Sequence, residues 1–445
     1  MSEKIRIKKG LDIPLDGKPS DKVTTDSTSY LYAIYPDDFP GPIWKATVKP
    51  GEKVKAGDII FTDKATGKLC LVAPVSGEVK DINRGERRHI NYLSIEKDST
   101  EPSSKLETGA VPETVEEIKE SLQRSGLWAM MRQRPFDIVP QVDAEPRDIF
   151  VTAFDTAPLA GEIIVEEDKE WLEKGLKVLS KLTKGKVYLD IRYGQDLTSQ
   201  VATVTEFEGP HPAGNVGPQI AAIKPVNKGE TVWTLDARTA VRIGKLCCAG
   251  LPDYETLVAV TGPEVTDPHL VKTVVGASIE GVLKGFVTDT KGKRIISGDV
   301  LTGVKTSPDG FLRYPYRQIT VIPEGDEADE FMGWASMSPG KFSVKRLFPS
   351  FLHNNRKPYD FDARIKGGRR AMILSGEYDK VFPFDIYPEY LLKAIMANDI
   401  ERMEKLGIYE VAPEDFALPE FVDVSKQELQ KIVREGLDSL RKELS

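Results

Sequence analysis

Cysteine is scarce in this 445-residue chain, which has only three such residues. They are Cys70, Cys247 and Cys248, and no two of them form a Cys-x-x-Cys pair. Three thiols cannot supply the four ligands of an iron–sulfur cluster, and they exclude a disulfide framework. The four histidines are scattered without metal-ligand spacing: His89, His211, His269 and His353. We therefore expect a protein of a reducing compartment with no metal site or cluster of its own.

Long apolar runs and an excess of positive charge are also lacking. No stretch approaches the roughly 18 consecutive apolar residues of a membrane-spanning helix, and residues 1–10 lack the apolar core of a secretion signal. We therefore expect the chain to stay in the cytoplasm without spanning a membrane. The formal net charge of -8 leaves no basic excess to offset phosphates, which argues against a nucleic-acid partner.

The usual phosphate-binding and catalytic motifs are absent from the sequence as well. The glycines within Gly209–Gly217 lack the Gly-x-Gly-x-x-Gly spacing, and prolines there remove amides that a pyrophosphate needs. Gly340-Lys341 lacks both the upstream glycine and the following hydroxyl residue of a P-loop. No Gly-x-Ser-x-Gly nucleophile elbow occurs. On its chemistry alone, the sequence predicts no catalytic site.

Between residues 44 and 97 the sequence contains short strand patterns separated by Gly and Pro turn signals. This density of strands predicts a small barrel or sandwich, and the segment resembles the biotinyl/lipoyl barrel-sandwich family. In that family the lysine of an Asp-Lys-Ala motif carries the cofactor, and Asp63-Lys64-Ala65 resembles the motif. Twelve residues separate Lys64 from Gly77, which indicates a longer hairpin. We therefore expect Lys64 to be an unmodified, exposed lysine.

The rest of the sequence predicts further domains of different classes. Strand and helix patterns alternate from about residue 148 to 262, which indicates an α/β layer with a partly parallel sheet. The spacing Ser425-x-x-Glu428 predicts the cap of a final helix. We expect a multidomain α+β protein with four parts: N-terminal strands plus a barrel-sandwich domain in 1–103, a Rossmann-like α/β domain in 104–257, a β-grasp domain of the soluble-ligand-binding type in 258–325, and a mainly helical domain in 326–445.

Stretches spread along the chain carry a resemblance to one protein family: Ile7–Leu15, Gly126–Asp137, Gly209–Gly217 and Gly368–Pro388. In these stretches the sequence resembles the A subunit of sodium-translocating NADH:quinone reductases. The resemblance implies membership of a six-subunit membrane complex that oxidises NADH, reduces quinone and exports sodium. It implies that activity belongs to the complex, and we expect none of the isolated chain.

That family is in turn similar to the flavin- and NADH-binding subunit of respiratory complex I. Those relatives hold FMN with a glycine-rich loop, whereas bulky side chains replace the glycines in the corresponding stretch here, Gly126–Pro135. The stretch Leu418–Lys426 also lacks the cysteines that family members often have there. We therefore expect no redox cofactor in this subunit, and the resemblance implies that FMN, riboflavin, FAD and iron–sulfur clusters belong to the other subunits.

The resemblance also implies a place for the chain in the cell. It implies a peripheral subunit on the cytoplasmic face of the bacterial inner membrane, docked on the membrane-embedded B subunit near the quinone. Two stretches combine aromatic residues with Pro or Arg, as a flat ring with two carbonyl groups requires: Leu31–Phe39 and Trp128–Phe136. The quinone-proximal candidates within them are Leu31, Tyr32, Phe39, Trp128, Arg132, Arg134 and Phe136. The interpretation of these residues as core or subunit interface stays open.

Three alternatives differ in their cofactors. A stand-alone NADH-oxidising flavoprotein would be coloured by its flavin, and a biotin or lipoyl carrier would show added mass at Lys64. The C-type subunit of a related ferredoxin:NAD oxidoreductase would need cysteine-rich cluster motifs, which the sequence lacks. The sequence does not distinguish ubiquinone from menaquinone as the acceptor.

Overall fold

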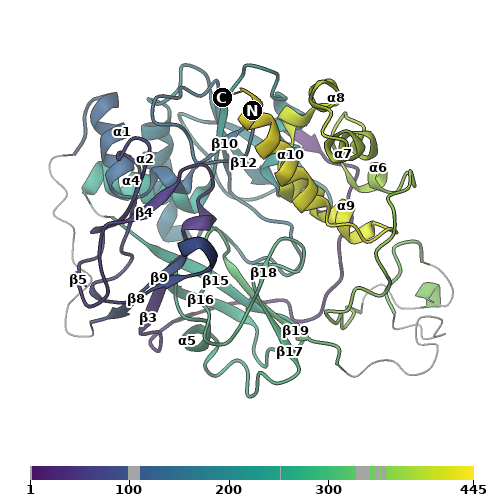
Figure 1. Ribbon diagram of the computed structural model, residues 1–445, viewed down its shortest axis with the longest axis horizontal. Helices are drawn as coiled ribbons and strands as arrows, with labels where there is room; N and C mark the ends of the chain where they lie inside the picture. Colours follow the sequence, from purple (N-terminus) through teal and green to yellow (C-terminus); the bar gives the residue numbers. More distant parts are fainter. Residues whose placement is uncertain are drawn as a thin grey trace.

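A six-stranded sheet lies at the centre of the computed structural model, which describes residues 3–98, 111–250, 252–326, 341–346, 350–352 and 357–444 (Figure 1). In spatial order its strands are β1 (Glu3–Arg6), β13 (Thr203–Glu208), β12 (Val187–Arg192), β11 (Ile149–Thr152), β14 (Val232–Asp236) and β10 (Arg132–Arg134). All neighbours are parallel except β10 and β14. Every residue of β11 is buried, as expected of a central strand covered on both faces.

Helices cover both faces of this sheet. The helices α2 (Lys169–Leu179) and α4 (Ala237–Ala249) pack with Leu189 in the main hydrophobic core. On the opposite face, Tyr188 packs with α3 (Val216–Ile223). Within the sheet, β12 and β13, which follow β11 in the sequence, lie on one side of β11, whereas the later strand β14 lies on the other side. The strand order therefore reverses at β11.

The predicted barrel-sandwich domain consists of two small sheets. One contains β3 (Leu31–Ile34), β9 (Ile90–Lys97), β8 (Gly77–Arg84) and β5 (Lys53–Val54), and the other contains β4 (Trp44–Ala46), β6 (Ile59–Asp63) and β7 (Cys70–Val72). The carboxylate of Asp63 folds the hairpin between β6 and β7 by accepting from the amides of Thr66 at 2.7 Å and Leu69 at 2.9 Å. Lys64 is exposed at the start of this hairpin, and its modification stays untested.

A third region forms a mixed sheet around residues 255–323. In spatial order its strands are β18 (Val304–Thr306), β17 (Lys293–Ser297), β19 (Gln318–Pro323), β15 (Glu255–Thr261), β16 (His269–Val274) and β2 (Ser20–Thr25). The short helix α5 (Ile279–Leu283) lies between β16 and β17 in the sequence. The expected N-terminal strands do not join the barrel-sandwich domain: β1 extends the central sheet, and β2 pairs with β16. Both add to a free sheet edge, which local sequence patterns do not reveal.

Helices dominate the C-terminal region from residue 378, as expected. They are α6 (Tyr378–Val381), α7 (Pro388–Met396), α8 (Ile400–Lys405), α9 (Ala417–Val422) and α10 (Leu429–Leu444), and they lie together at one side of the molecule (Figure 1). A separate core holds them together, with Phe416 and Leu437 fully buried. Ser425 does not cap α10 as predicted, because the helix begins only at Leu429; its hydroxyl donates instead to the carbonyl of Ala371 at 3.0 Å. Within the described residues, no helix is both long and apolar enough to cross a membrane.

Candidate functional site

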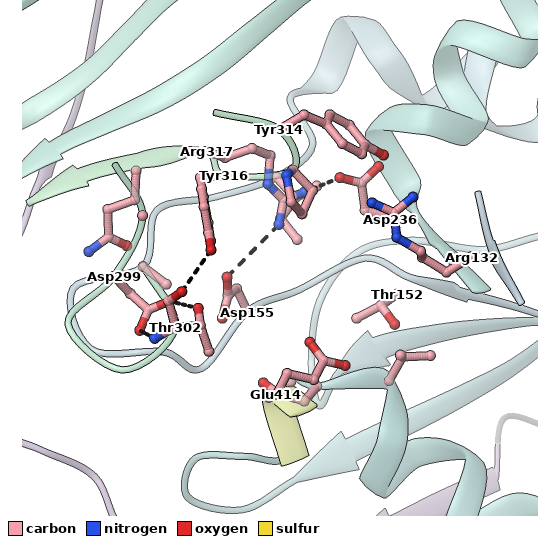
Figure 2. Close-up of a pocket in the computed structure, with 18 of the residues that line it drawn as sticks. Arg132, Thr152, Asp155, Asp236, Asp299, Thr302, Tyr314, Tyr316, Arg317 and Glu414 are labelled. Atoms are coloured by element: carbon pink, nitrogen blue, oxygen red, sulfur yellow. Dashed lines mark hydrogen bonds and ion pairs between the residues drawn. The ribbon is translucent and has the colours of Figure 1, made fainter. Parts of the chain in front are cut away.

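A cavity of about 540 Å³ opens at the carboxyl ends of β11 and β14, where the strand order reverses (Figure 2). Open α/β sheets bind ligands at this position, because loops leave the sheet in opposite directions there. Thr152 ends β11 and Asp155 follows it, while Asp236 ends β14. The residues 214–216, at the start of α3, complete this part of the wall.

The opposite wall comes from the other three regions of the chain. The loop Arg313–Gln318, which leads into β19, faces the central sheet across the cavity. Asp37 and Asp38, in the 3-10 helix η1 (Pro36–Asp38), come from the barrel-sandwich domain. Glu414, in the 3-10 helix η8 (Pro413–Phe416), comes from the C-terminal helices. The cavity therefore exists only when all four regions are packed together.

Arg317 links the two walls. Its guanidinium contacts the Asp236 carboxylate at 2.9 Å and the Asp155 carboxylate at 3.9 Å, as the dashed lines in Figure 2 show. Burial raises the pKa of Asp236, but the guanidinium groups of Arg317 and Arg242 outweigh it and hold that pKa below its ordinary value. Asp236 also caps α4 by accepting from the Thr239 amide at 2.7 Å. This carboxylate therefore stays ionised and is already fully engaged by the protein.

Asp38 is held in the same way at the mouth of the cavity. Its carboxylate forms an ion pair with Arg313 and accepts from the amide of Tyr314 at 3.1 Å. Burial raises the pKa of Asp38 to about 6, although the guanidinium of Arg313 acts in the opposite direction. The Tyr314 hydroxyl donates to the carbonyl of Met130 at 2.6 Å. These bonds fix the loop before β19 against both the barrel-sandwich domain, through Asp38, and the α/β domain, through Met130.

Glu414 contributes a carboxyl group with a raised pKa to the cavity wall. Its side chain is 41 % exposed towards the cavity, and one oxygen lies 2.9 Å from Nη2 of Arg134. The same guanidinium binds Asp415, whose side chain is fully buried, at 2.8 Å. The surrounding protein and the nearby Asp415 carboxylate raise the pKa of Glu414 to about 8, with Arg134 opposing them.

The charges of the wall do not suit a flavin phosphate. Three guanidinium groups line the cavity, those of Arg132, Arg313 and Arg317. Carboxyl groups are more numerous: Asp37, Asp38, Asp137, Asp155, Glu162, Asp236, Asp299 and Glu414. Two of the guanidinium groups are bound to carboxylates, and that of Arg132 donates to backbone carbonyls. A phosphate dianion would therefore meet a largely acidic wall in the described part of the chain.

Comparison with known proteins identifies the family. Family models match residues 5–98 as the "NqrA N-terminal barrel-sandwich hybrid domain", residues 113–251 as the "NqrA second alpha/beta domain" and residues 257–307 as the "NQRA C-terminal domain". The chain is 37% identical over 453 residues to the A subunit of the Na(+)-translocating NADH-quinone reductase of Neisseria meningitidis serogroup B, with 99% of this chain and 100% of the relative covered. The chain belongs to the A-subunit family of Na(+)-translocating NADH-quinone reductases.

Other relatives are equally similar over their full length. The A subunit of Marinomonas sp. (strain MWYL1) is 39% identical over 98% of this chain and 99% of its own, and that of Hahella chejuensis is 38% identical over 99% and 100%. The resemblance stated from the sequence is thus confirmed, as are the barrel-sandwich and α/β domain types. Among solved structures, an NAD+-reducing [NiFe]-hydrogenase chain has a TM-score of 0.33 at 13% identity, with 47% of each chain covered.

In this member of the A-subunit family, the two aromatic stretches predicted to face quinone meet at the cavity. Arg132 lines the cavity, and its guanidinium donates to the carbonyl of Asp38 at 2.6 Å. Phe39 lies behind the wall, where its ring stacks on that of Tyr314 with centroids 5.0 Å apart. The two stretches, predicted separately from the sequence, therefore form one rim.

Two of the other predicted candidates, Trp128 and Tyr32, are core residues. Trp128 is fully buried; its indole N–H donates to the carbonyl of Pro140 at 2.8 Å, and its ring contacts Trp233 edge-on at 5.0 Å. The ring face of Trp128 therefore lies in the protein core, and a ligand in the cavity does not reach it. Tyr32 is buried in the barrel-sandwich domain, and Leu31 pairs with Glu96 in the same sheet.

The remaining two candidates connect the central sheet to the C-terminal helices. Arg134 is 1% exposed and has its donors directed at Glu414 and Asp415. Phe136 has a left-handed backbone with φ 82°, and its ring packs against the C-terminal core. Its carbonyl oxygen accepts a hydrogen bond from the guanidinium of Arg434 at 2.7 Å. Neither side chain lines the cavity.

Several cavity residues were not among the predicted candidates. Asp155 and Asp236 lie at or just beyond the carboxyl ends of two strands that the sequence did predict. Applying the rule for ligand sites in α/β sheets to those strands would have selected them. Arg317, Asp299 and Glu414 carry no comparable signal, because only the packing of distant segments brings them to the cavity.

Proposed function

We propose that the chain is a peripheral subunit on the cytoplasmic face of the bacterial inner membrane. It docks on the membrane-embedded B subunit of a Na(+)-translocating NADH–quinone reductase, borders the quinone, and carries no redox cofactor of its own. Full-length identity to the A subunits of such reductases supports membership of the complex. One structural observation supports the quinone: the stretches Leu31–Phe39 and Trp128–Phe136 converge on the rim of the cavity through the bond from Arg132 to Asp38.

The cavity has the size and lining that a quinone head group requires. Its volume of about 540 Å³ lies within the usual range for small-molecule pockets. Phe154, Ile163 and Leu235 offer apolar contact, while the Arg132 guanidinium supplies a polar donor at the rim. A neutral quinone is compatible with the acidic wall, because it brings no phosphate charge that the carboxylates would repel.

The same wall supports the proposal that this chain holds no flavin. The described guanidinium groups of the cavity are already bound within the protein, which leaves little positive charge to balance a phosphate dianion beside the carboxylates of the wall. We expect the purified full-length chain to be colourless, without the visible absorption of a flavin. Stoichiometric flavin in the purified chain would contradict this part of the proposal.

A cavity-filling substitution tests the quinone assignment. Ala160 lines the cavity, and Ala160→Phe would occupy part of its volume. In the assembled complex we expect this variant to raise the apparent KM for quinone several-fold, while NADH oxidation with an artificial acceptor stays unchanged. Ala65→Phe, in the exposed hairpin after β6, is the matched control. An unchanged KM in a fully assembled Ala160→Phe complex would place the quinone outside this cavity.

Docking is tested separately from quinone binding. Affinity purification of the tagged chain from solubilised membranes should recover the B subunit together with the rest of the complex. Deleting the B subunit should release the chain from the membrane fraction of the cells. Recovery of an assembled complex in which the tagged chain contacts other subunits, but not the B subunit, would refute the assignment of that docking partner.

A further inference from the structure

A basic, extended segment runs over the surface of the C-terminal helices. Residues 364–374, here called the basic strap, form neither helix nor strand. The strap is tied to the loop before α10, because the amide of Arg370 donates to the carbonyl of Ser425 at 2.8 Å. At its end, the amides of Ser375 and Gly376 donate to the Glu389 carboxylate of α7 at 2.8 and 2.9 Å. The strap is therefore held in place at more than one point.

Large apolar side chains of this region remain in water although their backbone is anchored. The exposed fractions are Ile365 60%, Ile373 56%, Leu374 50%, Tyr387 68% and Tyr390 55%. The centroids of the two tyrosine rings are 6.1 Å apart. Tyr390 directly follows Glu389, whose carboxylate binds the backbone at the end of the strap. The backbone just after Leu374 is thus bound to α7, the helix that also carries Tyr390. Exposed apolar patches of this kind mark contact sites with other molecules or membranes.

The strap is also cationic in a chain whose net charge is -8. It contains no acidic residue and four basic ones, Arg364, Lys366, Arg369 and Arg370. Arg364 and Lys366 form ion pairs with Asp362, just before the strap, at 2.6 and 2.7 Å, so the arginines at 369 and 370 carry the charge of the strap. The pair between Arg369 and Glu428, 2.8 Å apart, is 60% and 48% exposed and so leaves the guanidinium largely hydrated. Arg370 is exposed at the surface. The local charge therefore favours an anionic surface.

We propose that the basic strap, with Tyr387 and Tyr390, rests directly on an anionic lipid surface. Aliphatic side chains and tyrosine rings enter the boundary between headgroups and acyl chains, and the arginines bind the lipid phosphates. This contact goes beyond the proposed docking on a membrane protein, because it places lipid rather than protein against this face. It would orient the peripheral chain without any membrane-spanning segment in the described residues.

The combination of side chains favours lipid over a second protein. Rings with one polar end suit the membrane–water interface, where the hydroxyl stays hydrated while the ring is buried. Each cationic side chain near a membrane surface adds to the binding energy for anionic lipids, and salt screens this attraction. A protein partner would instead have to present an acidic surface that matches the strap in shape.

Vesicle sedimentation with the full-length chain tests the proposal. The probes are vesicles of phosphatidylcholine alone and vesicles that also contain phosphatidylglycerol. We expect binding to the anionic vesicles, loss of that binding at high salt, and little binding to the neutral ones. Arg369→Gln/Arg370→Gln should weaken binding to anionic vesicles about tenfold or more. Ile373→Ser/Leu374→Ser should weaken it at constant charge.

A matched control separates the strap from overall charge. Arg87 and Arg88 are also adjacent exposed arginines, but they lie in the barrel-sandwich domain. Arg87→Gln/Arg88→Gln changes the net charge equally and should leave binding unchanged. The single variant Arg370→Gln spares the ion pair of Arg369, so its weaker binding cannot come from loss of that pair.

The outcomes separate this proposal from the docking proposal. Absence of binding to phosphatidylglycerol vesicles at low salt, or equal loss in the strap and control variants, would overturn the lipid contact. Loss of complex assembly in the strap variants together with undetectable vesicle binding would assign this face to a protein partner instead. Binding to vesicles by the isolated chain would stand even if the B subunit proved not to be the docking partner.

Discussion

Replacing Arg134 by methionine should destabilise the folded chain by about 3–5 kcal/mol, because it leaves the buried Asp415 carboxyl group without its cation. The Arg134 side chain is 1% exposed and joins β10 to the C-terminal helices. Its guanidinium donates to Asp415 at 2.8 Å, to Glu414 at 2.9 Å and to the carbonyl of Glu410 at 3.2 Å. Methionine keeps most of the side-chain volume and removes only the charge and the hydrogen bonds.

The magnitude follows from Asp415, whose side chain is fully buried. Burial already raises the pKa of Asp415 above its ordinary value of 3.8, and Arg134 is the main opposing influence. Without Arg134, the buried carboxyl group must take up a proton at pH 7. Neutralising a carboxyl group that ionises at 3.8 in the unfolded chain costs about 1.4 kcal/mol per pH unit, or about 4 kcal/mol at pH 7.

The same reasoning gives the sign of the pH dependence. In the Arg134→Met variant, the folded state holds a proton on Asp415 that the unfolded state has released above about pH 4. The stability lost on substitution should therefore shrink by about 1.4 kcal/mol for each pH unit from 7 towards 4. Urea-induced unfolding of the wild type and the variant at several pH values, followed by tryptophan fluorescence, measures this difference.

Two results would refute the reasoning. One is a loss below about 1 kcal/mol at pH 7, the ordinary value for an exposed ion pair. The other is a loss that does not change with pH. The double variant Arg134→Met/Asp415→Asn is the control: it removes both charges, so it should recover much of the loss, whereas independent effects would simply add.

Three further perturbations test other parts of the fold. Gly175→Ala should destabilise the α2–α4 contact by about 1–3 kcal/mol, because its Cβ would lie 1.9 Å from the carbonyl oxygen of Ala240; an unchanged thermal unfolding curve would contradict this. Asp190→Asn should stabilise the chain at neutral pH, because burial raises the pKa of Asp190 well above its ordinary value of 3.8. The stability of the wild type should therefore fall as the pH rises above 3.8, and that of the variant should not. Equal pH slopes of the unfolding free energy, measured with urea, would refute this prediction. Replacing all three cysteines by alanine should leave the activity of the complex largely intact at a packing cost of about 1–2 kcal/mol, and loss of a redox centre would contradict the assignment.

Local sequence patterns determined the kind of structure that each region forms. The alternating strand and helix patterns from about residue 148 predicted the α/β layer that contains the buried strand β11. The spacing of Thr114 and Glu117 is that of a capping box, which is present at the start of α1 (Val115–Arg124). Dense turn signals predicted the barrel-sandwich domain. The adjacent cysteines on α4 divide as a helix requires, with Cys247 buried and Cys248 exposed. These features depend on neighbours within a few residues, so a single sequence contains the information.

Tertiary structure alone decided which segments meet and which polar groups are buried together. Arg134 and Asp415 are 281 positions apart, and Arg132 and Asp38 are 94 apart, yet both pairs are in direct contact. The sequence marked Trp128 as an aromatic available to a ligand, but packing against Trp233 placed it in the core. Side-chain type and spacing do not encode such partners, because burial is set by the packing of the whole chain and each long-range contact depends on all the others. The cavity, its acidic wall and the exposure of the basic strap therefore became visible only in the folded protein.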